Sequence, residues 1–82
     1  MMRVRVKLFA MIRELAGMGE GSLSLAPGAS AGEAVDALIE DHPKLKEWKP
    51  YIRVAVNCTY VPMGFILHDG DEVAVIPPVS GG

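Results

Sequence analysis

The sequence has few of the residues that mark several common protein classes. Its single cysteine, Cys58, excludes an internal disulfide, and a secreted disulfide scaffold is not indicated. No stretch without Asp, Glu, Lys or Arg is long enough to span a membrane, so no membrane-spanning segment is expected. Aromatic residues make up 6% of the chain, the formal net charge is −2 and no basic block is present, so nucleic acid is not an expected partner.

The N-terminal residues do not have the pattern of a targeting segment. Arg3, Arg5 and Lys7 alternate with valines instead of preceding an apolar block. The expected compartment is therefore the cytoplasm. With 82 residues and no linker or repeat, the chain is expected to form one domain around a single core.

Two-residue alternation of apolar and polar side chains predicts most of the strands. The first strand is expected at residues 3–8, with its valines and Leu8 facing the core. Similar patterns predict strands at 22–26, 52–57 and 72–76. Asn57 and Cys58 are expected to begin a tight hairpin that leads into a short strand at 60–62.

Two helices are expected between the strands. A short one at 10–15 is stopped by Gly17, and the main one follows Ser30, which forms a capping-box pattern with Glu33, and ends near His42-Pro43. Residues 44–50 are expected to form a short helical turn or loop, and 69–71 a turn. This order predicts an α+β domain of the β-grasp (ubiquitin-like) type, a mixed sheet of four to five strands with the main helix on one face. The β-grasp domain is expected at 1–76, and a flexible extended tail at 77–82.

The tail has a composition suited to entering another protein. Pro77-Pro78 favours an extended course and removes two amide donors, so the strand cannot continue in a ladder. Gly81-Gly82 then forms a thin, adaptable end. A free α-carboxyl group has a pKa near ~3.5, so the terminal carboxylate is expected to be ionised at neutral pH and to need activation before it can react as an electrophile.

The sequence resembles the MoaD/ThiS family of sulfur carriers over essentially its whole length. The residues that carry the resemblance are Leu8-Phe9-Ala10, Arg13-Glu14-Leu15 with Gly17, Val54-Ala55-Val56-Asn57, and 69–74 running into 76–82. Thiamine-type carriers also end in Gly-Gly. The approach through Pro77-Pro78-Val79-Ser80 is similar to the MoaD branch, the small subunits of molybdopterin synthase.

The resemblance implies a carrier cycle centred on Gly82. An E1-like adenylating enzyme would use ATP to activate the Gly82 carboxylate, and a sulfur donor would convert it to a thiocarboxylate. The large subunit of molybdopterin synthase, in a heterotetramer, would accept the tail and pass the sulfur to cyclic pyranopterin monophosphate. The tail residues Pro77, Pro78, Val79, Ser80 and Gly81 would enter that active site. The chain itself would bind no cofactor or metal and would act as a co-substrate more than as a catalyst.

The sheet face away from the main helix is the candidate docking surface. Alternation places on it Arg3, Arg5, Lys7, Arg53, Ala55, Ala74 and Ile76, a mixed basic and apolar set beside the tail. The resemblance adds Arg13, Tyr60 and Ile76 as partner contacts. The alternative is an ordinary solvated sheet face.

Other candidate sites are less well supported by the sequence. Cys58 has no neighbouring cation to activate it, and His42 and His68 lack metal-ligand spacing. Residues 69–72 are too short for a calcium loop. Three other functions stay open: a sulfur carrier for thiamine or tRNA thiolation, a ubiquitin-like modifier joined to lysines through Gly82, and an interaction domain with an inert tail.

Overall fold

The computed structural model describes residues 1–78. Within these residues the chain forms five strands, two α-helices and one 3₁₀ helix. In chain order they are β1 (Met2–Leu8), α1 (Ala10–Ala16), β2 (Glu20–Leu25), α2 (Ala31–Asp41), η1 (Pro43–Tyr51), β3 (Arg53–Val56), β4 (Thr59–Val61) and β5 (Glu72–Ile76).

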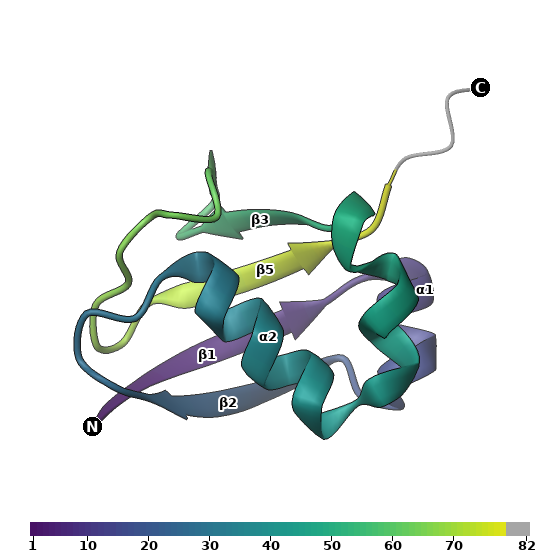
Figure 1. The fold of residues 1–82 in the computed structure, drawn as a ribbon, viewed down its shortest axis with the longest axis horizontal. Coiled ribbons are helices and arrows are strands. Elements are labelled where there is room, and N and C mark those ends of the chain that lie inside the picture. The colour runs from purple at the N-terminus through teal and green to yellow at the C-terminus, as the bar shows by residue number, and fades with distance from the viewer. Residues whose placement is uncertain (79–82) are drawn as a thin grey trace.

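The strands form one mixed sheet in the order β2-β1-β5-β3-β4. The central strands β1 and β5 are parallel, and all the other neighbours pair antiparallel. α2 and η1 cover one face of the sheet, and α1 lies at the end where β1 and β5 finish (Figure 1). This arrangement is the β-grasp architecture, so the predicted fold class is confirmed.

The core lies between the sheet and its helices, and the strand alternation determines which side chains enter it. In β1, Val4, Val6 and Leu8 are at most 2% exposed, whereas Arg3 and Arg5 face solvent. β5 contributes Val73 and Val75 in the same way. From the helices come buried side chains that include Ile12, Val35, Leu38 and Leu45. Burial of this apolar surface is the main force that holds the helices on the sheet.

Local signals determine where α1 ends and where α2 begins. α1 ends at Gly17, whose φ of 74° lies in the left-handed region that glycine tolerates best. At the start of α2, the Ser30 hydroxyl accepts a 3.2 Å hydrogen bond from the Glu33 amide, as the capping pattern predicts. The amides of Ala31 and Gly32 donate to the carbonyls of Phe65 and Met63, each at 2.8 Å. The start of α2 is therefore fastened to the loop between β4 and β5.

The largest difference from the expected elements is at residues 43–51. A short helical turn or loop is predicted at residues 44–50, and the structure has a nine-residue 3₁₀ helix, Pro43–Tyr51, so the helical alternative holds over a longer segment than expected. Leu45, Trp48 and Tyr51 are spaced by three residues, the repeat of a 3₁₀ helix, so they share one side of it. Leu45 is fully buried, and the rings of Trp48 and Tyr51 meet edge to face with centroids 6.3 Å apart. Packing of these side chains stabilises the 3₁₀ helix although the segment as a whole is polar.

The turn at residues 69–71 fastens three parts of the sheet together. The Asp69 carboxylate accepts a 2.8 Å hydrogen bond from the Arg3 amide, at the start of β1. Asp71 accepts one from the His68 amide at 2.8 Å and one from the Asn57 side-chain amide at 3.0 Å. Asn57, whose φ of 49° suits the tight β3–β4 turn, also accepts from the Glu72 amide at 3.0 Å. The turn expected to be merely solvated therefore also connects β1, the β3–β4 turn and the start of β5 through hydrogen bonds.

The Asp71 carboxylate should make stability depend on pH in acid. The His68 amide, followed by the Asn57 amide and the charge of His68, holds the pKa of Asp71 below its ordinary value of 3.8. A carboxylate with a lowered folded-state pKa stabilises the fold above its unfolded pKa, and that contribution is lost as the pH falls through the folded pKa.

We expect Asp71→Asn to lower the free energy of unfolding at pH 7 by about 0.5–1 kcal/mol, because one of the two acceptors becomes a donor. The deficit should shrink as the pH falls below 3.8, where the carboxylate of the unfolded wild type takes up a proton, and should disappear below the lowered pKa of the folded state. Urea unfolding at pH 7 and pH 3 measures both effects. Glu40→Gln, on the exposed side of α2, is the control and should show no such pH-dependent difference. A deficit for Asp71→Asn that is the same at both pH values would contradict the role given to the charge.

Candidate functional site

The start of the predicted tail continues directly from the central strand β5. Ile76 is the last residue of β5 and pairs with Arg53 of β3. Pro77 is buried and Pro78 is exposed, so the chain leaves the protein surface between these two residues. Neither proline can donate an amide to a neighbouring strand, which ends the ladder at this point. The predicted tail residues Val79, Ser80, Gly81 and Gly82 lie outside the residues that the structure describes, and their roles stay predictions.

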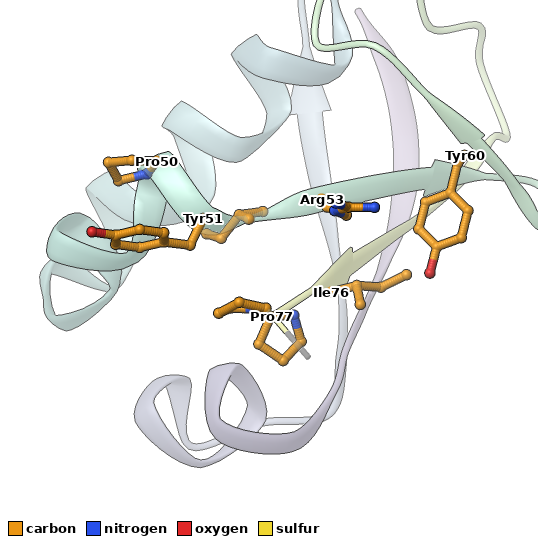
Figure 2. A pocket seen from close by; sticks show the side chains of 8 residues that line it. Pro50, Tyr51, Arg53, Tyr60, Ile76 and Pro77 are labelled. Carbon is orange, nitrogen blue, oxygen red and sulfur yellow. The ribbon is translucent and has the colours of Figure 1, made fainter. Parts of the chain in front are cut away.

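A shallow hollow of about 670 Å³ adjoins the start of the tail. Figure 2 shows Tyr51 at one end of it and Tyr60 at the other, with Arg53, Ile76 and Pro77 between them. Elements η1, β3, β4 and β5 supply its lining, which consists of Pro50, Tyr51, Ile52, Arg53, Tyr60, Ile76, Pro77 and Pro78. We call it the tail hollow. Three of the predicted interface residues, Arg53, Tyr60 and Ile76, are thus brought together around the base of the tail.

The register of the sheet explains why these three side chains meet. Arg53 and Ile76 are direct partners, so their side chains share the face away from α2. Tyr60 is opposite Ala55, one position along the same face of β3. Tyr60 is 64% exposed and Tyr51 58%. Two exposed aromatic rings with an arginine between them have the composition of the energetic centre of a protein interface.

Arg5 lies on the same sheet face, where a carboxylate offsets the positive charge of Arg5 and Lys7. Arg5 and Lys7 each lie 3.5 Å from the carboxylate of Glu72, which is directly opposite Arg5 in the β1–β5 register. Exposed ion pairs of this kind contribute little to stability. Their effect is to offset part of the positive charge predicted for this face, so the basic character is weaker than the sequence pattern indicates.

Arg13 is separate from the other predicted contacts. It projects from α1 and lines a second hollow of about 570 Å³, together with Lys7, Leu8, Phe9, Ala10, Gly19 and Glu20. Because β1 and β5 are parallel and Leu8 pairs with Val75, this hollow opens at the same end of the sheet as the tail. We call it the α1 hollow. The tail therefore leaves the domain between two hollows. Of the predicted interface residues, Arg53, Tyr60 and Ile76 line the tail hollow, Arg13 lines the α1 hollow, and Arg5 lines neither.

Several interface features were missed at the sequence level. Pro50 and Tyr51 line the tail hollow, although the sequence predicts only a polar helical turn or loop at residues 44–50 and no surface role for Tyr51. The spacing of Leu45, Trp48 and Tyr51 was the available signal for a 3₁₀ helix. No sequence signal indicated the role of Gly19 in the α1 hollow.

The other candidate sites have no support in residues 1–78. Cys58 is exposed in the β3–β4 turn with a φ of 73°, and His68 donates its backbone amide to Asp71. Within this part of the chain, no group of three or more His, Cys, Asp or Glu side chains is placed to hold a metal ion. None of the described helices is both long and apolar enough to cross a membrane.

Comparison with known proteins identifies the family. The ThiS family model matches residues 6–82. The molybdopterin synthase sulfur carrier subunit of Chlamydomonas reinhardtii is 41% identical over 83 residues, covering 99% of this chain and 100% of the relative.

Among solved structures, small archaeal modifier protein 1 of H. volcanii matches with a TM-score of 0.89 and 31% identity, covering 96% of this chain and 100% of that one. One chain of a complex of subunits 1 and 2 of the molybdopterin-converting factor from Helicobacter pylori matches with a TM-score of 0.70 and 27% identity. The match covers 99% of this chain and 100% of that one. Since the family model and these relatives cover nearly the whole chain, the chain belongs to the ThiS family, the MoaD/ThiS group that its motifs predicted.

Proposed function

We propose that this chain is the sulfur carrier subunit of a molybdopterin synthase and that the carboxylate of Gly82 carries the sulfur. The observation that carries the proposal is the exit of the tail: Pro77-Pro78 leaves a rigid central strand beside a hollow lined by Tyr51, Tyr60 and Ile76. A short arm on a rigid base, next to a surface suited to docking, lets a partner hold the domain while the end of the arm reacts elsewhere. The end-to-end similarity to a carrier subunit supports the same function.

The proposed cycle begins with activation of Gly82. An oxygen of the carboxylate attacks the α-phosphate of ATP in an E1-like adenylating enzyme, which forms an acyl-adenylate and releases pyrophosphate. A donor that supplies hydrosulfide then displaces AMP, and the product is a thiocarboxylate. Activation is needed because the free carboxylate is ionised at neutral pH and a poor electrophile.

The second half of the cycle delivers the sulfur. The thiocarboxylate sulfur attacks an oxygen-bearing carbon of cyclic pyranopterin monophosphate, and the carbon–oxygen bond at that carbon breaks, so that the oxygen leaves as the sulfur is bound. Water then cleaves the bond between the acyl carbon and sulfur, which returns the Gly82 carboxylate and leaves the sulfur on the pterin as a thiol. Two such transfers build the dithiolene of molybdopterin. In this scheme the acids and bases belong to the partners, and the chain contributes its tail and its docking surface.

We propose the large synthase subunit, in a heterotetramer with this chain, as the main partner. The similarity to one chain of the Helicobacter pylori complex of subunits 1 and 2 supports that choice. The adenylating enzyme and the sulfur donor are further partners in the same proposal. ATP is used by the adenylating enzyme, and all of this takes place in the cytoplasm.

Reconstitution tests this function. The chain is mixed with the adenylating enzyme, ATP, a sulfide source, the large subunit and cyclic pyranopterin monophosphate. Intact mass should show one oxygen at Gly82 replaced by sulfur, and molybdopterin should then form. A carrier that is never thiolated would reject the proposal. One that is thiolated but transfers only to a thiamine or tRNA system would keep the carrier function and change the acceptor.

A second candidate function is a protein modifier joined to lysines through Gly82. The observation in its favour is the similarity to small archaeal modifier protein 1, at a TM-score of 0.89. The last basic residue before Gly82 is Arg53, so trypsin would leave residues 54–82 on a modified lysine. Mass spectrometry of tryptic digests from cells that express the chain would detect that remnant. Remnants that depend on this chain would support conjugation, and their absence would leave sulfur transfer as the function.

A further inference from the structure

The side chain of Arg13 lies against the backbone of Gly19. A Cβ atom added to Gly19 would be 3.0 Å from both Nε and Cζ of Arg13 and 3.4 Å from its Cδ. Carbon atoms at optimal contact are about 3.5–4.0 Å apart, so any side chain at position 19 would require the guanidinium to move. The absence of a side chain at Gly19 is therefore what makes room for Arg13.

Glycine is not needed at position 19 for its backbone conformation. Gly17, Gly28 and Gly70 have positive φ values, whereas Gly19 does not. The clash that a Cβ would cause is with the far end of a flexible side chain and not with backbone, so the fold can accommodate alanine at low cost. Space for Arg13 is the feature that distinguishes this glycine.

The charges around the α1 hollow leave Arg13 available to a partner. Lys7, the other cation of this hollow, pairs with Glu72 at 3.5 Å. Within residues 1–78, Arg13 has no carboxylate within 4.0 Å, and Glu20, which also lines the hollow, is not its partner. Phe9, 45% exposed, lies beside it. An exposed cation that packs against the Gly19 backbone, next to an exposed ring, is complementary to a carboxylate flanked by apolar atoms.

We propose that Gly19 is a positioning residue that holds Arg13 ready for a carboxylate on the protein that receives the tail. The inference rests on the proposed function, because it requires a partner that docks at the tail end of the sheet. An arginine that is free in solution loses side-chain entropy when an interface immobilises it, and one already held against a backbone loses less. A charge at the rim of an interface acts mainly on the association rate and on its dependence on salt.

A double-mutant cycle with the large synthase subunit as the probe tests the inference. Arg13→Ala should weaken binding about three- to fivefold, chiefly through slower association, and should flatten the salt dependence because it removes the charge. Gly19→Ala keeps the charge, so it should weaken binding by at most the same factor and leave the salt dependence near that of the wild type. Because both changes act through one guanidinium, the double variant should bind no more weakly than Arg13→Ala alone. Gly64→Ala is the matched control: no atom lies within 4 Å of its added Cβ, and it should bind like the wild type. Gly19→Ala with wild-type affinity, or effects that multiply in the double variant, would overturn the inference.

A second measurement needs no partner. Nuclear magnetic relaxation of the Arg13 Nε–H group should show a more ordered side chain in the wild type than in Gly19→Ala, while Arg53 is unchanged. Equal mobility of Arg13 in the two proteins would overturn the positioning role, whatever the partner does. Failure of the wild type to bind the large subunit would instead reject the proposed function and the carboxylate contact with it, and the relaxation result would still decide whether Gly19 holds Arg13.

Discussion

Deletion of Gly81 and Gly82 is expected to abolish sulfur transfer completely while the thermal unfolding temperature stays at the wild-type value. The deletion moves the reacting carboxylate by two residues, at most about 7 Å, and removes the two positions without side chains. Misplacement of a reacting group by even about 1 Å can cost a hundredfold in rate. The buried core consists of residues up to Val75 together with Pro77, so the fold does not depend on the deleted pair.

Two single substitutions separate length from shape in the tail. Ser80→Ala keeps the length and should retain thiolation and transfer. Gly81→Val also keeps the length but adds a β-branched side chain, which should block entry into partner active sites without unfolding the domain. Thiocarboxylate formation is followed by intact mass, and transfer by molybdopterin production. Normal transfer by the deletion variant would mean that the tail is inert, and normal transfer by Gly81→Val would contradict passage through a narrow slot.

Truncation of Tyr60 should produce the second large effect. Tyr60→Ala is expected to weaken binding to the large synthase subunit by about 30-fold or more, because an exposed tyrosine beside Arg53 and Ile76 has the properties of an interface hot spot. The cost in stability should be small, since the ring is 64% exposed in the free domain. Calorimetric titration of the two proteins measures the affinity.

Phe65→Ala is the matched control for Tyr60→Ala. Phe65 is also an exposed aromatic, at 36%, but it belongs to the loop fastened to α2 and does not line the tail hollow. Its truncation should leave the affinity within about twofold of wild type. If the two variants lost affinity equally, the interface would not be centred on the tail hollow.

Much of the fold could be predicted because its signals are local. Alternation along β1 separates Val4 and Val6 from Arg3 and Arg5 without knowledge of any other segment. The Ser30 cap and the Gly17 stop are likewise contained within a few residues. The same local reasoning correctly placed Arg53 and Ile76 on the face away from α2, since strand period alone determines the side on which they lie.

The features that could not be predicted depend on contacts between distant segments. The amide of Arg3 donates a hydrogen bond to the carboxylate of Asp69, and the sequence around neither residue indicates this pairing. Packing of Leu45 into the core turns a polar stretch into η1 and brings Tyr51 to the tail. The division of the predicted partner contacts between two hollows depends on the relative positions of α1, η1 and the sheet, which residue spacing does not contain.

The parallel pairing of β1 with β5 has a consequence for synthesis of the protein. The two central strands come from opposite ends of the chain, so the innermost pairing is also among the most distant in sequence. A nascent chain that has not released β5 from the ribosome leaves one edge of β1 without its partner and lacks Val73 and Val75 in the core. Folding of such non-local topologies waits for closure of a long loop. β5 is thus the strand that completes the sheet, and a nascent chain that has not yet released it lacks both the central pairing and part of the core.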